Sequence, residues 1–140
     1  MRIAIVGTGG IGAPLGASLA TVGQGVIFLA RGAHLAAMRT NGLRVEGDRG
    51  ETVVRPVEAT DNPAAIGPGD LMLFCVKLWD VEAAGNHVRP LIGSETVVIP
   101  LQNGVDASER LGLTWVNLAP WRASQSTVRP ALAATAAANC

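Results

Sequence analysis

A glycine-rich segment near the N-terminus has residue types and spacing suited to binding a phosphate-bearing ligand. It matches the pattern G-x-G-x-x-G and reads Gly7-Thr8-Gly9-Gly10-Ile11-Gly12. An apolar run, residues 3–6, precedes it and a helical pattern follows it, and in this context the pattern predicts a dinucleotide site. The first glycine permits a tight turn, the second lets the backbone approach a pyrophosphate, and the third lets the helix pack on the strand. A flexible loop or a turn needed only for packing is the alternative, and the flanking pattern favours dinucleotide binding.

Arg31 comes directly after the second apolar run, residues 26–30. At this position an NAD-binding site usually carries Asp or Glu for the ribose hydroxyls, whereas an arginine suits the 2′-phosphate of NADP. One charge-assisted hydrogen bond contributes about 1.5–3 kcal/mol, and about 1.4 kcal/mol changes an equilibrium tenfold. A single contact is therefore enough to set a cofactor preference. Because the chain holds ten arginines, a solvated loop residue is the alternative, and the position favours NADP.

Two further polar side chains follow predicted strands. Lys77 is the only lysine in the chain and comes directly after the apolar run 71–76. A single lysine among ten arginines indicates a need for a compact ammonium group, although chance gives the same pattern. Asn103 follows the run 96–99 and is able to hydrogen-bond a carboxamide or a substrate oxygen, but Asn-Gly is equally an ordinary turn. A functional role and a structural role stay open for both residues.

The remaining reactive side chains predict no further site. His34 and His87 fall in helical segments without a partner at ligand spacing, so we expect surface or half-buried histidines and no metal site. Cys75 lies inside an apolar run and predicts a small core residue, and together with the terminal Cys140 it offers no disulfide framework. The sequence contains no tyrosine, which excludes for this chain a tyrosine general acid of the short-chain dehydrogenase type.

The elements that must position these residues alternate between apolar runs and helical patterns. Predicted strands cover residues 3–6, 26–30, 71–76 and 96–99, and predicted helices cover residues 10–22, 34–40, 81–88 and a segment that begins at Asp106. Residues 43–45 and 52–54 predict a small hairpin, and residues 61–70 are mostly loop. The alternation predicts an α/β fold of Rossmann type, doubly wound, with a mostly parallel sheet. Ligands of such sheets bind at the carboxyl ends of the strands, so the candidate residues should meet at one edge: Gly9, Arg31, Lys77 and Asn103.

The last thirty residues break this pattern. All 11 acidic residues lie before residue 111, and the segment 111–140 holds eight alanines, two prolines and two of the three tryptophans. We therefore expect an NADP-binding domain over residues 1–110 and an atypical Ala-rich tail over residues 111–140. A poorly ordered extension is one explanation of the tail. A natural continuation that was lost or misread, for example by a frame shift, is the other and is favoured.

Composition excludes several classes of protein. The chain is 49% hydrophobic and 16% charged, which argues against disorder, and its 140 residues suit one domain. Its 11 basic and 11 acidic side chains cancel, so the charge of a nucleic-acid binder is absent. The longest apolar run is far shorter than the roughly 20 residues that span a bilayer, and five glycines and Pro14 interrupt the segment where a secretory signal would lie. We expect a cytoplasmic protein that binds neither nucleic acid nor a membrane.

With these residues in place, the sequence resembles the N-terminal domain of the ketopantoate reductase (2-dehydropantoate 2-reductase) family over about residues 1–110. The resemblance rests on the strand and loop at residues 3–12, Arg31-Gly32-Ala33-His34-Leu35 with Asn41-Gly42-Leu43, Val76-Lys77-Leu78-Trp79-Asp80, and Leu101-Gln102-Asn103-Gly104-Val105. It implies NADPH-dependent reduction of a small 2-keto acid, 2-dehydropantoate, to pantoate on the route to pantothenate and coenzyme A. It also implies that residues 7–12 bind the pyrophosphate, that Arg31 binds the 2′-phosphate, and that Lys77 and Asn103 lie near the nicotinamide and the substrate.

The sequence departs from that family after residue 111. Family members continue with another strand and a helical C-terminal domain, from which a lysine protonates the substrate oxygen after hydride transfer from nicotinamide C4. No lysine follows Lys77 here, so the general acid of the family has no counterpart in these residues. We therefore expect a truncated fold that lacks the helical C-terminal domain, binds NADP and does not turn over the substrate at a normal rate.

Three other interpretations stay open. Another two-domain dehydrogenase, acting on a small hydroxy acid or a sugar phosphate, would keep the cofactor and change the reaction. An NADP-binding sensor module without catalysis would need only the glycine loop and Arg31, so Lys77 and Asn103 would be replaceable in it. A truncated product without a stable fold is the third.

Overall fold

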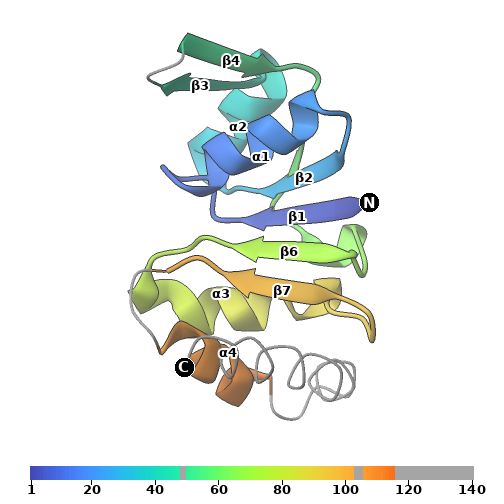
Figure 1. Cartoon of the computed structure of the whole chain (residues 1–140), viewed down its shortest axis with the longest axis vertical. Helices are drawn as coiled ribbons and strands as arrows, with labels where there is room; N and C mark the ends of the chain where they lie inside the picture. The colour runs from blue at the N-terminus through green and yellow to red at the C-terminus, as the bar shows by residue number, and fades with distance from the viewer. Residues whose placement is uncertain (48–49, 103–105, 116–140) are drawn as a thin grey trace, which may run out of the picture.

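A five-stranded parallel sheet forms the centre of the computed structural model (Figure 1), which describes residues 1–47, 50–102 and 106–115. The strand order is β5-β2-β1-β6-β7, and each pair of neighbours is parallel. The strands are β1 (Arg2–Val6), β2 (Gly25–Leu29), β5 (Glu58–Thr60), β6 (Leu71–Phe74) and β7 (Val97–Pro100).

Side chains alternate between the two faces of this sheet and build two apolar cores. From β1, Ile3 and Ile5 enter one core, whereas Ala4 and Val6 enter the other, because successive residues of a strand point to opposite faces. The first core also holds residues of α1 (Gly12–Thr21) and α2 (Gly32–Asn41), and the second holds residues of α3 (Val81–His87) and α4 (Ala107–Thr114). Helices thus cover both faces, and the predicted doubly wound α/β fold of Rossmann type is confirmed.

The predicted hairpin forms a separate two-stranded sheet. Strand β3 (Leu43–Gly47) pairs antiparallel with β4 (Gly50–Val54). Leu43 is buried in the first core, and Val45 and Val54 pack against that core. The hairpin contacts α1 and lies beside it, at the end of the molecule away from β7 (Figure 1).

The sheet changes its direction of winding between β1 and β6. Strands β1, β2 and β5 follow one another to one side, and the chain then crosses back to place β6 on the other side of β1. A reversal of this kind leaves a crevice at the carboxyl ends of the two central strands, where ligands of open α/β sheets bind. The segments directly after β1, β2 and β6 therefore reach the same edge.

Several boundaries differ from the prediction. Strand β5 was not predicted, because a strand of three residues with only Ala59 buried is too short for alternation to show. Helix α1 begins at Gly12 rather than at residue 10, and β6 ends at Phe74 rather than at residue 76. The prediction placed residues 10–11 in the helix because they are small or apolar, and residues 75–76 in the strand because they are apolar. In the structure these residues lie in loops at the carboxyl edge of the sheet.

Helix α4 runs through the boundary that the sequence suggests at residue 110. It ends at Thr114, and Trp115 is fully buried in the second core, where its ring meets that of Phe74 edge to face at 6.2 Å between centroids. Asp106 stands at the N-cap position, as its type predicts, but its side chain makes no capping hydrogen bond. The folded core thus continues to Trp115, and the rest of the predicted tail, residues 116–140, lies outside the described residues.

Three short 3-10 helices complete the described part of the chain: η1 (Pro63–Ala65), η2 (Leu78–Asp80) and η3 (Arg89–Leu91). Among the helices that the structure describes, none has the length and apolar character needed to cross a membrane.

Candidate functional site

The glycine loop leaves β1 in a turn that only glycine accommodates at two positions. Gly7 has a φ of +94°, and a Cβ on it would lie 2.9 Å from backbone atoms of both Cys75 and Val76. A Cβ on Gly12 would overlap the carbonyl oxygen of Gly7. At Gly9, in contrast, a Cβ would meet no atom within 4 Å, so this stretch of backbone is open to a ligand. The steric requirements of the predicted loop are therefore met.

The loop leads into the N-terminus of α1, which offers backbone donors to an anion. Ile11 occupies the N-cap position, no side chain caps the helix, and its first turn contains no acidic residue. The N–H of Ala13 already donates to the oxygen of Gly9 at 3.0 Å, and Pro14 has no N–H, so fewer donors remain here than at an ordinary helix N-terminus. The positive end of the helix dipole still favours a negatively charged group there. These features fit the pyrophosphate of a dinucleotide.

Arg31 opens onto a cavity of about 230 Å³, named here the Arg31 cavity. Arg31 is exposed and stands at the N-cap position of α2, one residue beyond Ala30 at the end of the β2 ladder. None of the ion pairs between described residues involves its guanidinium group. The cavity is lined by side chains and backbone from the ends of β1 and β2 and from α3, including Gly7, Thr8, Arg31, Val76 and Ala84. A free guanidinium group beside the glycine loop fits a phosphate.

Both histidines line the Arg31 cavity, which the sequence did not predict. Both are exposed, in agreement with the predicted surface position. His34 lies in the first turn of α2, and His87 ends α3 with its Nε2 atom 3.0 Å from the backbone oxygen of Asp61. Within the described residues, no group of three or more His, Cys, Asp or Glu side chains is placed to hold a metal ion. Because both histidines line the Arg31 cavity, they are candidates for contact with a ligand bound there.

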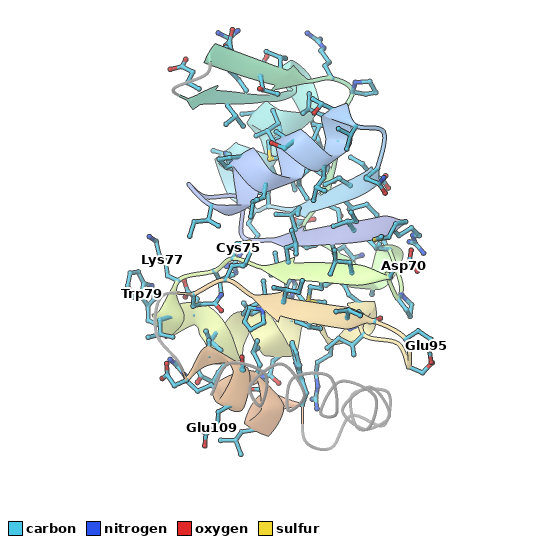
Figure 2. The ribbon with its side chains drawn as sticks, viewed as in Figure 1. Asp70, Cys75, Lys77, Trp79, Glu95 and Glu109 are labelled. Atoms are coloured by element: carbon cyan, nitrogen blue, oxygen red, sulfur yellow. The ribbon has the colours of Figure 1, made fainter. Side chains whose placement is uncertain are left out.

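Lys77 lines a second cavity of about 350 Å³, named here the Lys77 cavity. Lys77 is exposed at the N-cap position of η2, three residues after β6. The glycine loop contributes Gly9, Gly10 and Ile11 to the lining of the same cavity. Figure 2 shows Lys77 and Trp79 at the carboxyl end of β6, whereas Asp70 lies at the other end of the strand. A primary amine thus stands at the carboxyl edge beside the glycine loop.

Cys75 also lines the Lys77 cavity, and it is half-buried. Burial raises the pKa of its thiol to about 11. The thiol is therefore protonated at neutral pH and a poor nucleophile, since the thiolate is the reactive form. Cys75 packs against the first core, which agrees with the predicted apolar role.

Gln102 is a residue of the Lys77 cavity that the sequence analysis did not single out. Its side-chain Nε2 donates hydrogen bonds to the backbone oxygens of Phe74 at 2.7 Å and Val76 at 3.0 Å. In the sequence it stands within Leu101-Gln102-Asn103-Gly104-Val105, one of the segments that carry the family resemblance. Its bonds could not be predicted, because a side chain that bonds to a neighbouring strand leaves no pattern along the chain.

The predicted site residues fall on two adjoining cavities. Gly7, Thr8 and Arg31 line the first, Gly9 and Lys77 line the second, and Val76 lines both. Asn103 lies outside the described residues, so its predicted place is not seen. The carboxyl edge therefore brings together the glycine loop, one guanidinium group and one primary amine, as expected from a parallel sheet.

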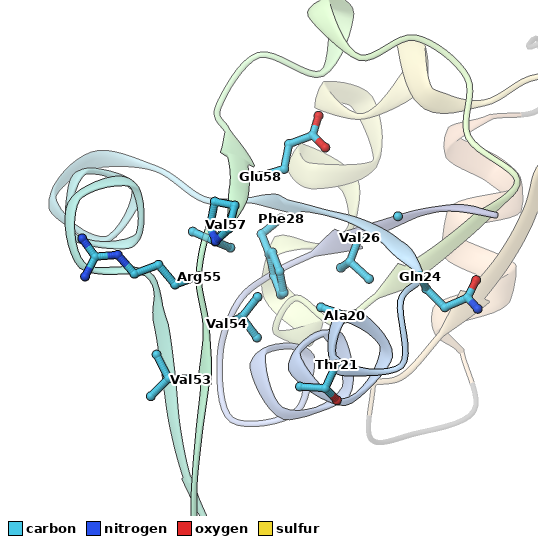
Figure 3. A pocket seen from close by; sticks show the side chains of 12 residues that line it. Ala20, Thr21, Gln24, Val26, Phe28, Val53, Val54, Arg55, Val57 and Glu58 are labelled. Atoms are coloured by element: carbon cyan, nitrogen blue, oxygen red, sulfur yellow. The ribbon is translucent and has the colours of Figure 1, made fainter.

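A third and larger cavity, of about 590 Å³, lies at the opposite end of the strands (Figure 3). It is bounded by the start of β2 at Gly25, the start of β5 at Glu58 and the end of β4 at Val54. Arg55, Gln24 and Thr21 supply polar side chains there, but no residue of the glycine loop contributes. Its size alone does not make it the candidate site, since open parallel sheets bind ligands at the other edge.

Known proteins resemble this chain in both sequence and structure. A 2-dehydropantoate 2-reductase of Mesorhizobium japonicum is 34% identical over 150 aligned positions, which cover 94% of this chain and 46% of the relative. A crystal structure of 2-dehydropantoate 2-reductase from Porphyromonas gingivalis matches with a TM-score of 0.71 and 42% identity over 80% of this chain and 42% of that one. A D-mandelate dehydrogenase solved with NADH matches with a TM-score of 0.74 over 81% of this chain and 37% of that one, but at 23% identity this likeness concerns the fold alone.

The chain thus spans less than half the length of the proteins it matches. The model of one protein family, described as ketopantoate reductase PanE/ApbA, matches residues 3–118. This match includes the glycine loop, Arg31, Lys77 and the segment around Asn103. The chain belongs to the ketopantoate reductase (PanE/ApbA) family of oxidoreductases.

Proposed function

We propose that this chain is the NADP-binding part of an NADPH-dependent 2-dehydropantoate reductase. The observation that carries the proposal is the meeting of the glycine loop, Arg31 and Lys77 on two cavities that share Val76. The glycine loop contributes to both cavities: Gly7 and Thr8 line that of Arg31, and Gly9, Gly10 and Ile11 line that of Lys77. A guanidinium group, a glycine loop and an amine together fit a dinucleotide that carries an extra phosphate at one end and the reacting ring at the other.

Each residue then has a distinct role in holding the cofactor. The pyrophosphate binds at the open backbone of Gly9 and the N-terminus of α1, and Arg31 holds the 2′-phosphate. Lys77, together with Asn103, holds the nicotinamide half and the keto acid at the carboxyl end of β6. When bound, NADPH supplies the hydride that reduces the 2-keto group. The residues of this chain bind and orient the two reactants.

We further propose that proton transfer to the substrate oxygen depends on groups beyond these 140 residues. No lysine follows Lys77, and the chain spans 46% of the Mesorhizobium japonicum reductase. The pantoate product rests on the family resemblance and the cytoplasmic location on composition, and both stay predictions. The polypeptide as printed should therefore bind NADPH and leave 2-dehydropantoate unreduced at an ordinary rate.

Two assays on the 140-residue chain test this proposal. In a fluorescence titration, NADPH should bind more tightly than NADH, because only NADPH carries the phosphate that Arg31 holds. In a coupled assay of NADPH oxidation with 2-dehydropantoate, ordinary turnover by the chain would refute the proposed need for further groups. The absence of any NADPH binding would refute the proposed function itself.

The sensor alternative predicts a different result for one residue. A module that only senses the dinucleotide has no use for an amine at the end of β6, whereas Lys77 is exposed on a cavity next to the glycine loop. Replacing Lys77 should weaken NADPH binding if the residue holds the nicotinamide half. Unchanged binding would favour the sensor.

A further inference from the structure

A side chain extends the hydrogen bonding between β6 and β7 beyond the last paired residues. The N–H of Val97 at the start of β7 donates to the oxygen of Asp70, just before β6, at 3.0 Å. The N–H of Leu101, just after β7, donates to the oxygen of Phe74 at the end of β6 at 2.9 Å. Past that point the side-chain amide of Gln102 donates to the oxygens of Phe74 and Val76. The side-chain amide thus donates to backbone oxygens at and beyond the end of β6, as a backbone N–H of a neighbouring strand does within a sheet.

The second of these bonds acts directly on the start of Lys77. The oxygen of Val76 belongs to the same rigid peptide group as the backbone nitrogen of Lys77. The hydrogen bond from Gln102 Nε2 to that oxygen, at 3.0 Å, therefore restrains the orientation of the peptide plane that precedes Lys77. Beyond Lys77 the chain turns at once into η2, where the N–H of Asp80 donates to the oxygen of Lys77 at 2.9 Å. Gln102 thus restrains the peptide group just before Lys77, and the η2 turn restrains the backbone just after it.

Burial of the Gln102 side chain costs free energy, which indicates that its amide has a function. Its Oε1 atom is buried, and no hydrogen-bond partner is found for it within the part of the chain that the structure describes. A buried acceptor without a partner costs about 1–3 kcal/mol, whereas an apolar side chain of the same length avoids that cost. Gln102 also lines the same cavity as Lys77 and Gly9.

We propose that Gln102 is a positioning residue for Lys77. It acts by fixing the Val76–Lys77 peptide group, and through it the place of the amine in the Lys77 cavity. The consequence for NADPH binding rests on the proposed function, because Lys77 is there taken to hold the nicotinamide half. Gln102 itself needs no contact with the cofactor.

The test uses the fact that Lys77 is the only lysine. Labelling the 140-residue chain with ¹⁵N-lysine gives one backbone amide resonance, and this amide belongs to the peptide group that Gln102 bonds. Gln102→Met keeps the length of the side chain and removes both donors, and it should shift this resonance without cofactor. Gln24→Met, at the opposite end of the strands, is the matched control and should leave the resonance in place. An unshifted resonance in Gln102→Met would overturn the proposal.

NADPH titrations then separate positioning from direct contact. Loss of one hydrogen bond of ordinary strength should weaken NADPH binding by Gln102→Met roughly 3- to 10-fold. In a Lys77→Met background the same change should have no further effect, because its effect passes through the amine. A full additional loss in the double variant would show direct contact with the cofactor and overturn the proposal.

Two further outcomes are distinguishable. If the wild-type chain binds no NADPH, the proposed function fails, while the Lys77 resonance still decides whether Gln102 sets the position of that residue. If Gln102→Met does not fold by circular dichroism, Gln102→Asn replaces it, since an amide one methylene shorter cannot reach both oxygens. The same shift and the same dependence on Lys77 are expected of it.

Discussion

Arg31 is the residue on which the cofactor preference should depend. Its guanidinium group is exposed at the start of α2, faces the Arg31 cavity and takes part in none of the ion pairs between described residues. Arg31→Asp should weaken NADPH binding by about tenfold or more, because a charge-assisted hydrogen bond becomes a charge repulsion. Binding of NADH should persist, since an Asp at this position suits ribose hydroxyls. Fluorescence titration with both nucleotides measures the change.

Arg44→Asp provides the matched control for this prediction. Arg44 lies on the exposed hairpin and pairs with Glu51 at 2.8 Å, so its replacement makes the same change of charge away from the carboxyl edge. The control should keep the wild-type preference. If Arg31→Asp kept it too, the 2′-phosphate would have to bind elsewhere.

Gly7 and Gly9 should respond differently to the same substitution. Gly7→Ala forces a Cβ against the backbone of Cys75 and Val76 at a φ of +94°, and we expect it to lose about 1–3 kcal/mol of unfolding free energy. Gly9→Ala meets no atom within 4 Å, so its stability should stay near that of the wild type. NADPH binding should nevertheless weaken, because the added methyl group occupies the space that the pyrophosphate needs. Urea unfolding and NADPH titration separate the two effects; tight binding by a stable Gly9→Ala variant would place the pyrophosphate elsewhere.

At the scale of the elements, Trp115 packs the end of α4 against the rest of the second core. The ring is fully buried against Phe74, and its Nε1–H donates to the backbone oxygen of Gly85 in α3 at 2.8 Å. Trp115→Ala should lower the free energy of unfolding by about 3–5 kcal/mol, as expected for removal of a large buried ring. Trp79→Ala removes a ring that is 76% exposed and should cost little. Equal losses in urea unfolding would mean that Trp115 is not part of the core.

A second link between α3 and α4 predicts a dependence on pH. Arg110 donates two hydrogen bonds to the Glu82 carboxylate, at 2.6 and 2.8 Å, and this contact lowers the pKa of Glu82. Because the folded pKa lies below the unfolded one, the stabilisation is complete above the unfolded pKa, about 4.3, and is lost as the pH falls through the folded value. Glu82→Gln should therefore have a lower Tm than the wild type at pH 7, and the difference should shrink below about pH 4. A constant difference between pH 7 and pH 3 would contradict this link. Glu109→Gln, on α4, controls for loss of a negative charge.

The sequence predicts elements better than it predicts their exact ends or their cross-strand contacts. Continuous apolar runs and glycines mark β1, β2, β6 and the loop after β1, because burial and turn geometry leave local signals. Strand β5 escapes prediction, since it owes its pairing to β2 and not to its own residues. Trp115, His34 and Gln102 escape for a related reason. Their partners lie far along the chain or on another element, and only the folded structure brings them together.

At the scale of the whole molecule, the parallel sheet explains why distant segments form one site. The ends of β1, β2 and β6 share an edge, so residues as far apart as Gly9 and Lys77 line one cavity. The membership of the ketopantoate reductase family agrees with this arrangement. The chain spans less than half the length of these relatives, and the turnover assay described above tests whether the proposed reduction needs residues beyond these 140.

Amide chemical-shift mapping of the ¹⁵N-labelled chain during an NADPH titration tests the central claim most directly. The resonances of residues 7–12, Arg31, Val76 and Lys77 should move together with saturation, while those around Gln24 and Arg55 at the other end of the strands stay in place. Shifts centred on Gln24 and Arg55, or no shifts at millimolar NADPH, would contradict cofactor binding at the carboxyl edge.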